Sequence, residues 1–440
     1  MRAYANYQNS ETEWLGQIPT SWEAVPLKHM ADFVNGAAFK PDQWSEQGAP
    51  IIRIENLNGG SDFNHFEGAV DERYHVEQGD ILFGWSGNRG TSFGPFIWSK
   101  PGHFLLNQHI FNVRGFDGDR GWFYWCLKAV TEYVEQQAHG IIGMVHVTKG
   151  NLGRIRVPLP PLAEQQAIAA FLDRETTKVD ALVEEQRRLI ALLKEKRQAV
   201  ISHAVTRGLD PAAPLKHSGI DWLGDIPAHW EQRPIRKLAK LESGHTPSRS
   251  RPEWWQDCYI PWFGLADVWQ IRSGDIEYVE ETKEKVSDLG LENSSARLLP
   301  AGTVILSRTA SVGYSAIMKV PMATTQDFAN WICGTRLMPD YLLYSLRSMG
   351  TEFERLRMGS THNTIYMPDI ASLRIALPSV DEQQAIVEYI RTRISDYDAL
   401  TAEATRAIAL LQERRAALIS AAVTGKIDVR NEVSGEEEAA

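Results

Sequence analysis

Two blocks of this sequence occur twice, in the same order and nearly the same distance apart. The first, WLGQIPTSWEAVPLKHMA at 14–31, returns as WLGDIPAHWEQRPIRKLA at 222–239. The second, LPPLAEQQAIAAFLD at 159–173, returns as LPSVDEQQAIVEYIR at 377–391. Two separate blocks that keep their order and register indicate a tandem duplication. The fold must therefore accommodate two copies of one architecture.

The segments framed by these blocks differ between the copies. Each contains short apolar runs separated by Gly- and Asn-rich turns, which is typical of strands, and one stretch of helical periodicity. The expected strands are 51–54, 80–83, 109–113, 259–263 and 303–306, and the expected helices are 122–137 and 341–358. We therefore predict a mixed α/β (α+β) domain in each copy. Similar frames around unlike segments predict two globular heads that perform different versions of the same task.

A long uninterrupted helix is predicted at the end of each copy. No Gly or Pro occurs from Glu164 to Thr206, which is about 43 residues or roughly 65 Å of helix. Apolar residues recur there at alternating three- and four-residue spacing, and the pattern returns in the second copy. This period predicts an antiparallel coiled coil; two helices packed separately on their own domains are the alternative. The residues expected at the helix–helix contact are Leu172, Val179, Leu182, Leu189, Leu193, Val200, Ile390, Tyr397, Leu400, Leu411 and Leu418.

These features divide the chain into five parts. We predict a first globular domain at 1–161, a first long spacer helix at 162–207, a second globular domain at 208–379, a second long spacer helix at 380–427 and an acidic disordered tail at 428–440.

Composition limits the classes of function. The formal net charge of -10 and the pI of about 5.7 argue against a chain that coats nucleic acid through bulk positive charge. The three cysteines, Cys126, Cys258 and Cys333, form no CxxC pair, so we expect neither a disulfide framework nor a zinc site. This cysteine usage predicts a cytoplasmic protein. The sequence contains no run of 18 apolar residues, so no membrane span is predicted.

Catalytic motifs are missing from the sequence. No GxGxxG follows an expected strand, and no NPP- or DPP-type tetrapeptide suited to base methylation occurs. Pro339-Asp340 and Pro368-Asp369 resemble the first half of a nuclease motif, but no (D/E)xK partner follows nearby. The 12 histidines form no HxxxH or HExxH pair, and no metal site is predicted. We therefore predict that the chain is not an enzyme.

The ordered set of motifs resembles the specificity subunit of type I restriction–modification systems over nearly the whole chain. The set consists of WLGxIPxxW with an upstream serine (Ser10, Ser218), a variable segment, LPxxxEQQAI at the start of a long helix, and a helix end near AVTxG. In this sequence the helix ends are AVTRG at 204–208 and AVTG at 422–425. Each motif alone is weak, but the double set is specific.

This resemblance implies a function. Each variable segment would be a target recognition domain that contacts one half of a bipartite, asymmetric double-stranded DNA target. The paired helices would set the gap between the halves and dock two modification (methyltransferase) subunits, which would carry S-adenosylmethionine and perform the DNA methylation. Restriction subunits with helicase and nuclease activity are further expected partners. This chain itself would hold no cofactor and contact no membrane.

Polar loop residues are the candidates for DNA contact, because base edges and phosphates are bound by Arg, Lys, His, Asn, Ser and Thr. Residues 86–91 and 307–311 follow equivalent strands and differ in sequence, which suits two different targets. The full set of expected DNA-contacting residues is Lys40, Arg53, Ser86, Asn88, Arg89, Thr91, His146, Lys149, Arg249, Arg251, Ser307, Arg308, Thr309, Ser311, Thr361, His362 and Asn363.

A second hypothesis comes from a different class of protein. The 14 Trp and 13 Tyr residues could instead form aromatic surfaces on a coiled-coil scaffold whose two heads bind proteins or glycans.

Overall fold

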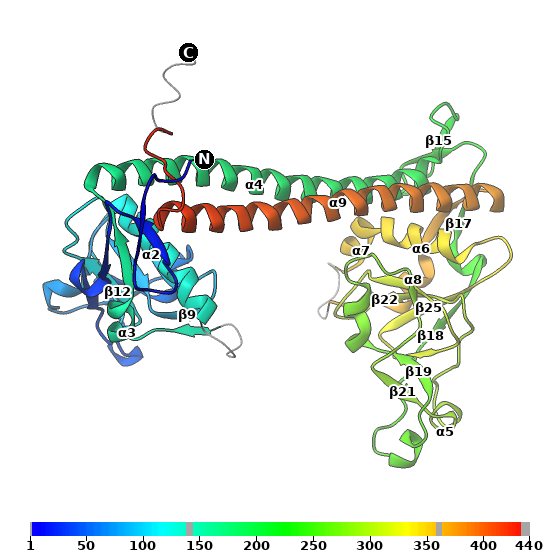
Figure 1. The fold of residues 1–440 in the computed structure, drawn as a ribbon. Helices are drawn as coiled ribbons and strands as arrows, with labels where there is room; N and C mark the ends of the chain where they lie inside the picture. The colour runs from blue at the N-terminus through cyan, green and yellow to red at the C-terminus, as the bar shows by residue number, and fades with distance from the viewer. Residues whose placement is uncertain (1, 138–143, 358–362, 433–440) are drawn as a thin grey trace. The chain divides into compact units, whose positions relative to one another are not determined.

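The computed structural model describes residues 2–137, 144–357 and 363–432 (Figure 1). The chain forms two compact units. Unit 1 contains residues 1–187 together with 406–440, and unit 2 contains residues 188–405. Each unit has mixed α/β structure, as predicted, but each long helix contributes one part to each unit instead of forming a domain of its own. Over the described residues, no helix combines the length and the apolar character needed to cross a membrane.

Unit 1 is built on two four-stranded sheets. The first is antiparallel, in the order β10-β8-β12-β4, and helix α2 (Arg120–Gln137) packs against β10. The second has the order β6-β5-β11-β7, in which β5 and β11 are parallel. The strands of unit 1 are β1 (Tyr7–Asn9), β2 (Gln17–Pro19), β3 (Glu23–Pro26), β4 (Asp32–Asn35), β5 (Ala49–Ile52), β6 (Asn64–Phe66), β7 (His75–Val76), β8 (Ile81–Gly84), β9 (Ser86–Asn88), β10 (Gly94–Ile97), β11 (Phe104–Leu106), β12 (Ile110–Arg114), β13 (Met144–His146) and β14 (Arg156–Leu159). Its short helices are α1 (Ile54–Leu57) and α3 (Lys149–Arg154).

Unit 2 repeats this plan with a five-stranded sheet, in the order β18-β25-β22-β23-β20, and a three-stranded sheet, in the order β21-β19-β24. Helix α6 (Pro339–Ser348) packs against β22 and β23. The strands of unit 2 are β15 (Leu215–His217), β16 (Asp225–Pro227), β17 (Glu231–Pro234), β18 (Ala239–Ser243), β19 (Ile260–Phe263), β20 (Tyr278–Val279), β21 (Glu284–Val286), β22 (Val304–Ser307), β23 (Ser315–Met318), β24 (Ala323–Thr324), β25 (Phe328–Cys333) and β26 (Arg374–Leu377). Its other short helices are α5 (Asp288–Glu292), α7 (Gly350–Arg357) and α8 (Met367–Ser372), and η6 (Leu265–Ile271) is a 3₁₀ helix.

The predicted strands occur within two residues of their expected positions, but one predicted helix is wrong. The stretch 341–358 was expected to be a single helix, whereas α6 ends at Ser348 and α7 starts at Gly350. Met349 caps α6 with non-helical dihedral angles (φ -85°, ψ 20°). Glycine is a poor residue for the interior of a helix, so the chain turns there instead of continuing.

The two long helices are α4 (Leu162–Arg207) and α9 (Val380–Val423). Helix α4 matches the predicted range, whereas α9 ends before the predicted residue 427. Gly425 has a φ of +73°, a left-handed conformation that favours glycine and commonly ends helices. Gly208, just after α4, has the equivalent φ of +74°.

In unit 1, the repeated motifs meet at one joint. Trp22, from the WLGxIPxxW motif, is 1% exposed and donates its indole N–H to Glu164 Oε2 in the first turn of α4 (2.8 Å). The Tyr4 hydroxyl donates to the same oxygen (3.0 Å). Gly425 lies against the Trp22 ring, where an added Cβ would come within 2.9 Å of it. Trp22 therefore contacts the start of α4 and the residues that follow α9.

The same joint forms in unit 2 with the helices exchanged. Trp230 is 1% exposed and donates to Glu382 Oε1 at the start of α9 (3.2 Å), and His229 Nε2 lies 2.7 Å from that oxygen. A Cβ added to Gly208 would be 3.1 Å from the Trp230 ring. The duplicated motifs thus recur because each unit needs the same three-way junction between a globular domain and two helix ends.

The first glutamine of each EQQ motif adds a second link. Gln165 accepts a hydrogen bond from the backbone N–H of Asp119, just before α2, and Gln383 accepts one from Met338, just before α6 (2.9 Å each). Both glutamines are buried. Their side chains therefore bind the long helix to the main helix of the globular domain in each unit.

An interhelical ion pair is formed twice, in register. In unit 1, Arg415 donates to both carboxylate oxygens of Asp180 (2.8 and 3.1 Å). In unit 2, Arg197 lies 3.8 Å from Asp398. The register of the repeated EQQAI blocks makes Asp180 equivalent to Asp398 and Arg197 equivalent to Arg415. Asp180 comes before Arg197 along α4, but their partners come in the reverse order along α9, since the partner of Asp180 is Arg415 and that of Arg197 is Asp398. The helix segments therefore run antiparallel, as predicted.

The residues predicted at the helix–helix contact differ in their exposure. Leu172, Val179, Leu193 and Ile390 are buried, and Val200, Tyr397, Leu411 and Leu418 are half-buried. Leu182, Leu189 and Leu400, however, are 45%, 40% and 51% exposed. The residue after each of them, Val183, Ile190 and Thr401, is the less exposed neighbour. Adjacent apolar pairs such as Leu182-Val183 fit the spacing equally well, so the sequence pattern did not choose between them.

This difference in exposure predicts different effects for two neighbouring substitutions. Val183→Glu should lower the free energy of unfolding by about 2–4 kcal/mol, because it places an unpaired carboxylate in the contact between the helices. Leu182→Glu should change it by less than about 0.5 kcal/mol, because that side chain already faces solvent. Urea unfolding of the isolated chain measures both. Equal effects of the two variants would contradict this difference.

Candidate nucleic-acid interface

Two of the predicted segments of unit 1 form one surface. We call residues 85–91 loop A and residues 144–149 loop B. Strands β9 and β13 pair antiparallel within them, so that Ser86 lies opposite His146. Trp85 supports the pair: its indole N–H donates to the Gln108 carbonyl (3.1 Å), and its ring contacts the His146 ring edge-on (4.9 Å). Segments far apart in the sequence thus present their polar side chains together.

Unit 2 forms the equivalent surface from residues 308–313 (its loop A) and 363–366 (its loop B). Thr309 lies opposite Thr364 in an antiparallel bridge. The Asn363 side-chain amide donates to the Ala310 carbonyl (2.8 Å), and the Ala310 N–H donates to the Asn363 carbonyl (3.1 Å). Thr361 and His362, also predicted to contact DNA, lie outside the described residues.

The exposure of the predicted residues differs along this surface. Ser86, Thr309 and Ser311 are half-buried. Ser307 is fully buried as the last residue of β22, so the expectation that it contacts DNA is wrong. Among the predicted residues of the two loops, the exposed ones are Asn88, Arg89, Thr91, His146, Lys149 and Asn363.

Arg308 is occupied within the protein. Its Nε and Nη2 donate to the Gln326 carbonyl (3.0 and 2.7 Å), and its Nη1 donates to the Ile365 carbonyl (3.3 Å). Arg308 thus plays the same role in unit 2 as Trp85 in unit 1, where the indole N–H of Trp85 donates to the carbonyl of Gln108, the equivalent of Gln326. Arg308 positions loop A, and its donors are bound to backbone carbonyls, which does not favour its predicted contact with DNA.

Other predicted cations are also paired or distant from the loops in sequence. Arg53 donates to Asn64, is 3.3 Å from Glu55 and covers the Trp44 ring. Arg249 pairs with Glu284 and stacks on Trp255, with 3.8 Å between the guanidinium carbon and the ring centre. The prediction that these two arginines contact DNA requires free donors. Both arginines instead have partners within the protein. The remaining two, Lys40 and Arg251, are exposed.

Sequence reasoning missed a small cavity of about 310 Å³ beside loop A of unit 1. Asn58, Asn107 and His109 line it together with Asn88 and Thr91. In the sequence, Asn58-Gly59-Gly60 is one of the Gly- and Asn-rich clusters that predict turns. The asparagines that indicate a turn were also the signal that could have indicated a binding surface.

Helix α2 holds loop A in unit 1. The Gly90 N–H donates to Glu135 Oε1 (3.1 Å). Burial, together with the charge of Glu135, raises the pKa of the Glu132 carboxyl to about 7. The folded state therefore favours the protonated acid, and this contribution to stability, fully present below pH 4.5, is lost as the pH rises through about 7.

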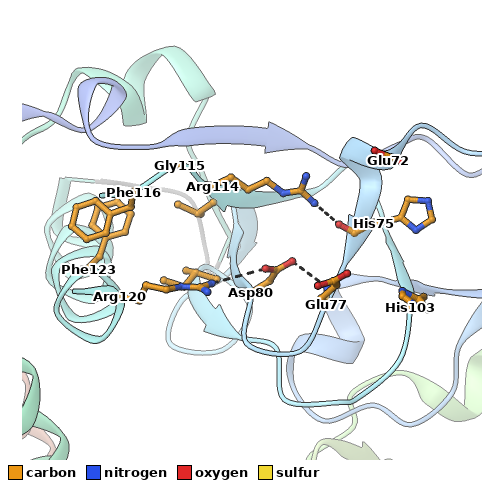
Figure 2. Close-up of a pocket in the computed structure, with 12 residues that line it drawn as sticks. Glu72, His75, Glu77, Asp80, His103, Arg114, Gly115, Phe116, Arg120 and Phe123 are labelled. Atoms are coloured by element: carbon orange, nitrogen blue, oxygen red, sulfur yellow. Dashed lines mark hydrogen bonds and ion pairs between the residues drawn. The ribbon is translucent and has the colours of Figure 1, made fainter. Parts of the chain in front are cut away.

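A larger cavity of about 830 Å³ lies at the other end of β8 from loop A. Figure 2 shows that three of its charged side chains face protein groups: Arg114 donates to the His75 carbonyl, and Arg120 approaches Asp80 (3.9 Å). Asp80 also accepts from the Glu77 N–H (3.1 Å). The arginines and the aspartate of this cavity are thus paired within the protein. No group of three or more His, Cys, Asp or Glu residues suited to a metal ion occurs in the described part of the chain.

Comparison with known proteins identifies the duplicated architecture. The family model described as the type I restriction modification DNA specificity domain matches residues 19–191 and 227–409, once for each copy. The specificity subunit of the type I restriction enzyme EcoBI from Escherichia coli is 24% identical, covering 96% of this chain and 91% of the relative. That of MjaVIII from Methanocaldococcus jannaschii is also 24% identical, covering 94% and 95%.

Solved structures share the fold. A chain from a structure concerning complex assembly and conformational transition of the type I R-M system aligns with a TM-score of 0.68, at 17% identity, over 93% of this chain and 99% of that one. The HsdS subunit from Thermoanaerobacter tengcongensis aligns with a TM-score of 0.53, at 17% identity, over 93% and 98%.

Proposed function

Because this chain belongs to the family of type I restriction–modification DNA specificity domains, we propose that it recognises a bipartite DNA target, with each unit contacting one half. The observation that carries the proposal is the repeated pairing of loop A with loop B in both units. Paired loops with exposed amides, hydroxyls and cations suit contact with base edges and phosphates. Family membership favours this function over that of a protein- or glycan-binding scaffold.

The two half-sites should differ, because equivalent loop positions carry different residues. The backbone pairings align the units residue by residue: the Val147 N–H donates to the Trp85 carbonyl (3.0 Å), as the Ile365 N–H does to the Arg308 carbonyl (2.8 Å). The resulting equivalent pairs are Trp85 and Arg308, Ser86 and Thr309, Asn88 and Ser311, and His146 and Thr364. Different donors and acceptors select different bases, so the target should be asymmetric.

The chain should act within a complex. Its net charge of -10 makes strong unaided binding to DNA unfavourable, since nonspecific affinity depends on cations that neutralise phosphates. Methyltransferase subunits that bind S-adenosylmethionine would supply both the catalysis and further contacts with DNA. This chain would have no catalytic role, restriction subunits would join the same complex, and the complex would act in the cytoplasm.

Exposed leucines on the long helices are the proposed docking points for two methyltransferase subunits. Leu182 and Leu400 are equivalent positions, 45% and 51% exposed, and Leu192 and Leu410 are equivalent positions, 47% and 66% exposed. Unit 1 contains Leu182 and Leu410, and unit 2 contains Leu400 and Leu192. Each unit thus presents one leucine of each kind, which favours two copies of one partner.

The binding experiment uses the chain assembled with its methyltransferase subunits. A footprint on selected DNA should show two protected stretches of defined sequence separated by a stretch of no fixed sequence. We also propose that the helices set this separation, so inserting one heptad into both α4 and α9 should lengthen the unselected stretch. Equal protection of random duplex would contradict the proposed function. An unchanged separation would contradict the spacing role alone.

A further inference from the structure

We infer that the segment following β5 in unit 1 and β19 in unit 2 is a third DNA-contacting element, in which Asn58 and Trp269 occupy equivalent positions and determine base preference in their own half-sites. The inference rests on the proposed function and adds residues that the loops A and B do not include. It assigns different chemistry to the two units: an amide in one and an indole in the other.

The equivalence of these positions follows from the strand pairing. Strand β5 pairs in parallel with β11, Ile52 opposite Leu106, and β19 pairs in parallel with β24, Phe263 opposite Thr324. The residue that follows each of these two strands, β5 and β19, then forms the same hydrogen bond with the side chain three residues later. The Arg53 N–H donates to Asn56 Oδ1 (2.8 Å), as the Gly264 N–H does to Asp267 Oδ2 (3.0 Å).

Asn58 and Trp269 occupy the same place beyond this hydrogen bond. Asn58 is the second residue after Asn56, and Trp269 is the second residue after Asp267. Asn58 follows α1 and Trp269 lies within η6. Both side chains are exposed. The two units therefore present different side chains at one equivalent surface position.

In unit 1, Asn58 faces the same cavity as loop A. It lines the space of about 310 Å³ with Asn88 and Thr91, and with Asn107 and His109 from the turn after β11. Three asparagines and two hydroxyl residues thus line one hollow, together with Arg53 and Glu55. Asparagine amides donate and accept in the geometry that matches an adenine edge in the major groove, so this hollow suits hydrogen-bonded base recognition.

In unit 2, the 3₁₀ helix that contains Trp269 is followed by a residue that contacts loop A. Residues three apart in a 3₁₀ helix are eclipsed, so Trp269 and Arg272, which follows η6, share one exposed face. Arg272 donates to Ser311 Oγ in loop A (3.4 Å). Trp269 is 70% exposed, the largest fraction among the large hydrophobic side chains of the described residues.

An indole so exposed near a polar loop offers apolar surface to a partner. Base pairs offer such a surface in the methyl group of thymine and, where a base step is unstacked, in the faces of the bases, whereas phosphates do not. Because the segment is continuous with loop A through Arg272 and Ser311, we assign this partner to DNA. Unit 2 would thus select its half-site partly by apolar contact where unit 1 uses an amide.

The test compares the bases selected from random DNA by the complete complex and by its variants. Trp269→Ala should reduce discrimination about tenfold at one or more base pairs of the unit 2 half-site and leave the other half unchanged, since a single mismatched base pair in a specific site typically lowers affinity by roughly that factor or more. Asn58→Ala should affect only the unit 1 half-site. Trp269→Phe should retain part of the preference. Leu298→Ala, which removes another exposed apolar side chain of unit 2 (52% exposed), is the control and should leave both halves unchanged.

Each contrary result has a distinct meaning. If the wild-type complex selects a bipartite sequence and Trp269→Ala selects the same bases with the same strength, the inference is wrong and the proposed function stands. A Trp269→Ala chain that no longer assembles with the methyltransferase subunits would place a protein against the indole and also overturn the inference. A wild-type complex with no base preference would overturn the proposed function itself.

Discussion

Replacing Trp22 with alanine should lower the free energy of unfolding by about 3–5 kcal/mol, the range for loss of a buried tryptophan. Trp22 is 1% exposed and lies where the WLGxIPxxW block, the first turn of α4 and Gly425 meet. The substitution removes the ring that fills this junction and one of the two hydrogen bonds to the buried Glu164 carboxylate. Thermal unfolding, or urea unfolding followed by circular dichroism, measures the loss.

Two further variants separate packing from hydrogen bonding at this joint. Trp22→Phe keeps an aromatic ring but removes the indole N–H, so it should cost less than alanine, about 1–3 kcal/mol. Tyr4→Phe removes only the other donor to Glu164; burial and the nearby carboxylate raise the pKa of the Tyr4 phenol, which keeps it protonated and able to donate. Trp269→Ala is the control outside the junction, since Trp269 is 70% exposed. A Trp22→Ala chain as stable as the wild type would contradict the structural role of the joint.

The duplicated architecture could be predicted from the sequence because its signals are local. The repeat, the strand runs and the lack of Gly and Pro from Glu164 to Thr206 are each visible in one stretch of chain. The joint could not be predicted in the same way. Trp22, Glu164 and Gly425 lie in three distant parts of the sequence, and only the folded chain shows that they touch.

The structure brings the predicted segments together, although it pairs several of the predicted side chains within the protein. Turns after equivalent strands were expected to face DNA, and the structure brings loop A and loop B together in both units. The individual arginines were less predictable, because an arginine near a loop can satisfy its donors within the protein. Arg308 does so through backbone carbonyls, and Arg249 through Glu284. Residue type alone does not distinguish these partners from phosphates or bases.

The helix contact shows the same limit in another form. A heptad period identifies a stripe, but it leaves the choice between adjacent apolar residues open. In the structure, Val183 takes the buried position and Leu182 the exposed one. An exposed leucine on a long helix costs little in the isolated chain, yet it provides apolar area to a partner. The positions that the periodicity misassigned are therefore among those proposed for docking.

Replacing the leucine pair of one unit should remove one methyltransferase subunit from the complex. Leu182→Glu with Leu410→Glu places two carboxylates on the proposed docking surface of unit 1, and Leu400→Glu with Leu192→Glu does so in unit 2. Burying each unpaired charge costs several kcal/mol, so the affinity at the altered unit should fall at least about 100-fold. Native mass spectrometry should then show one partner per chain for either pair and none for all four substitutions. Gln412→Glu, which adds a charge at another exposed position of α9, should leave two partners bound. Two bound partners in the fourfold variant would contradict docking on these leucines, and their loss in the Gln412→Glu control would show that added charge alone prevents assembly.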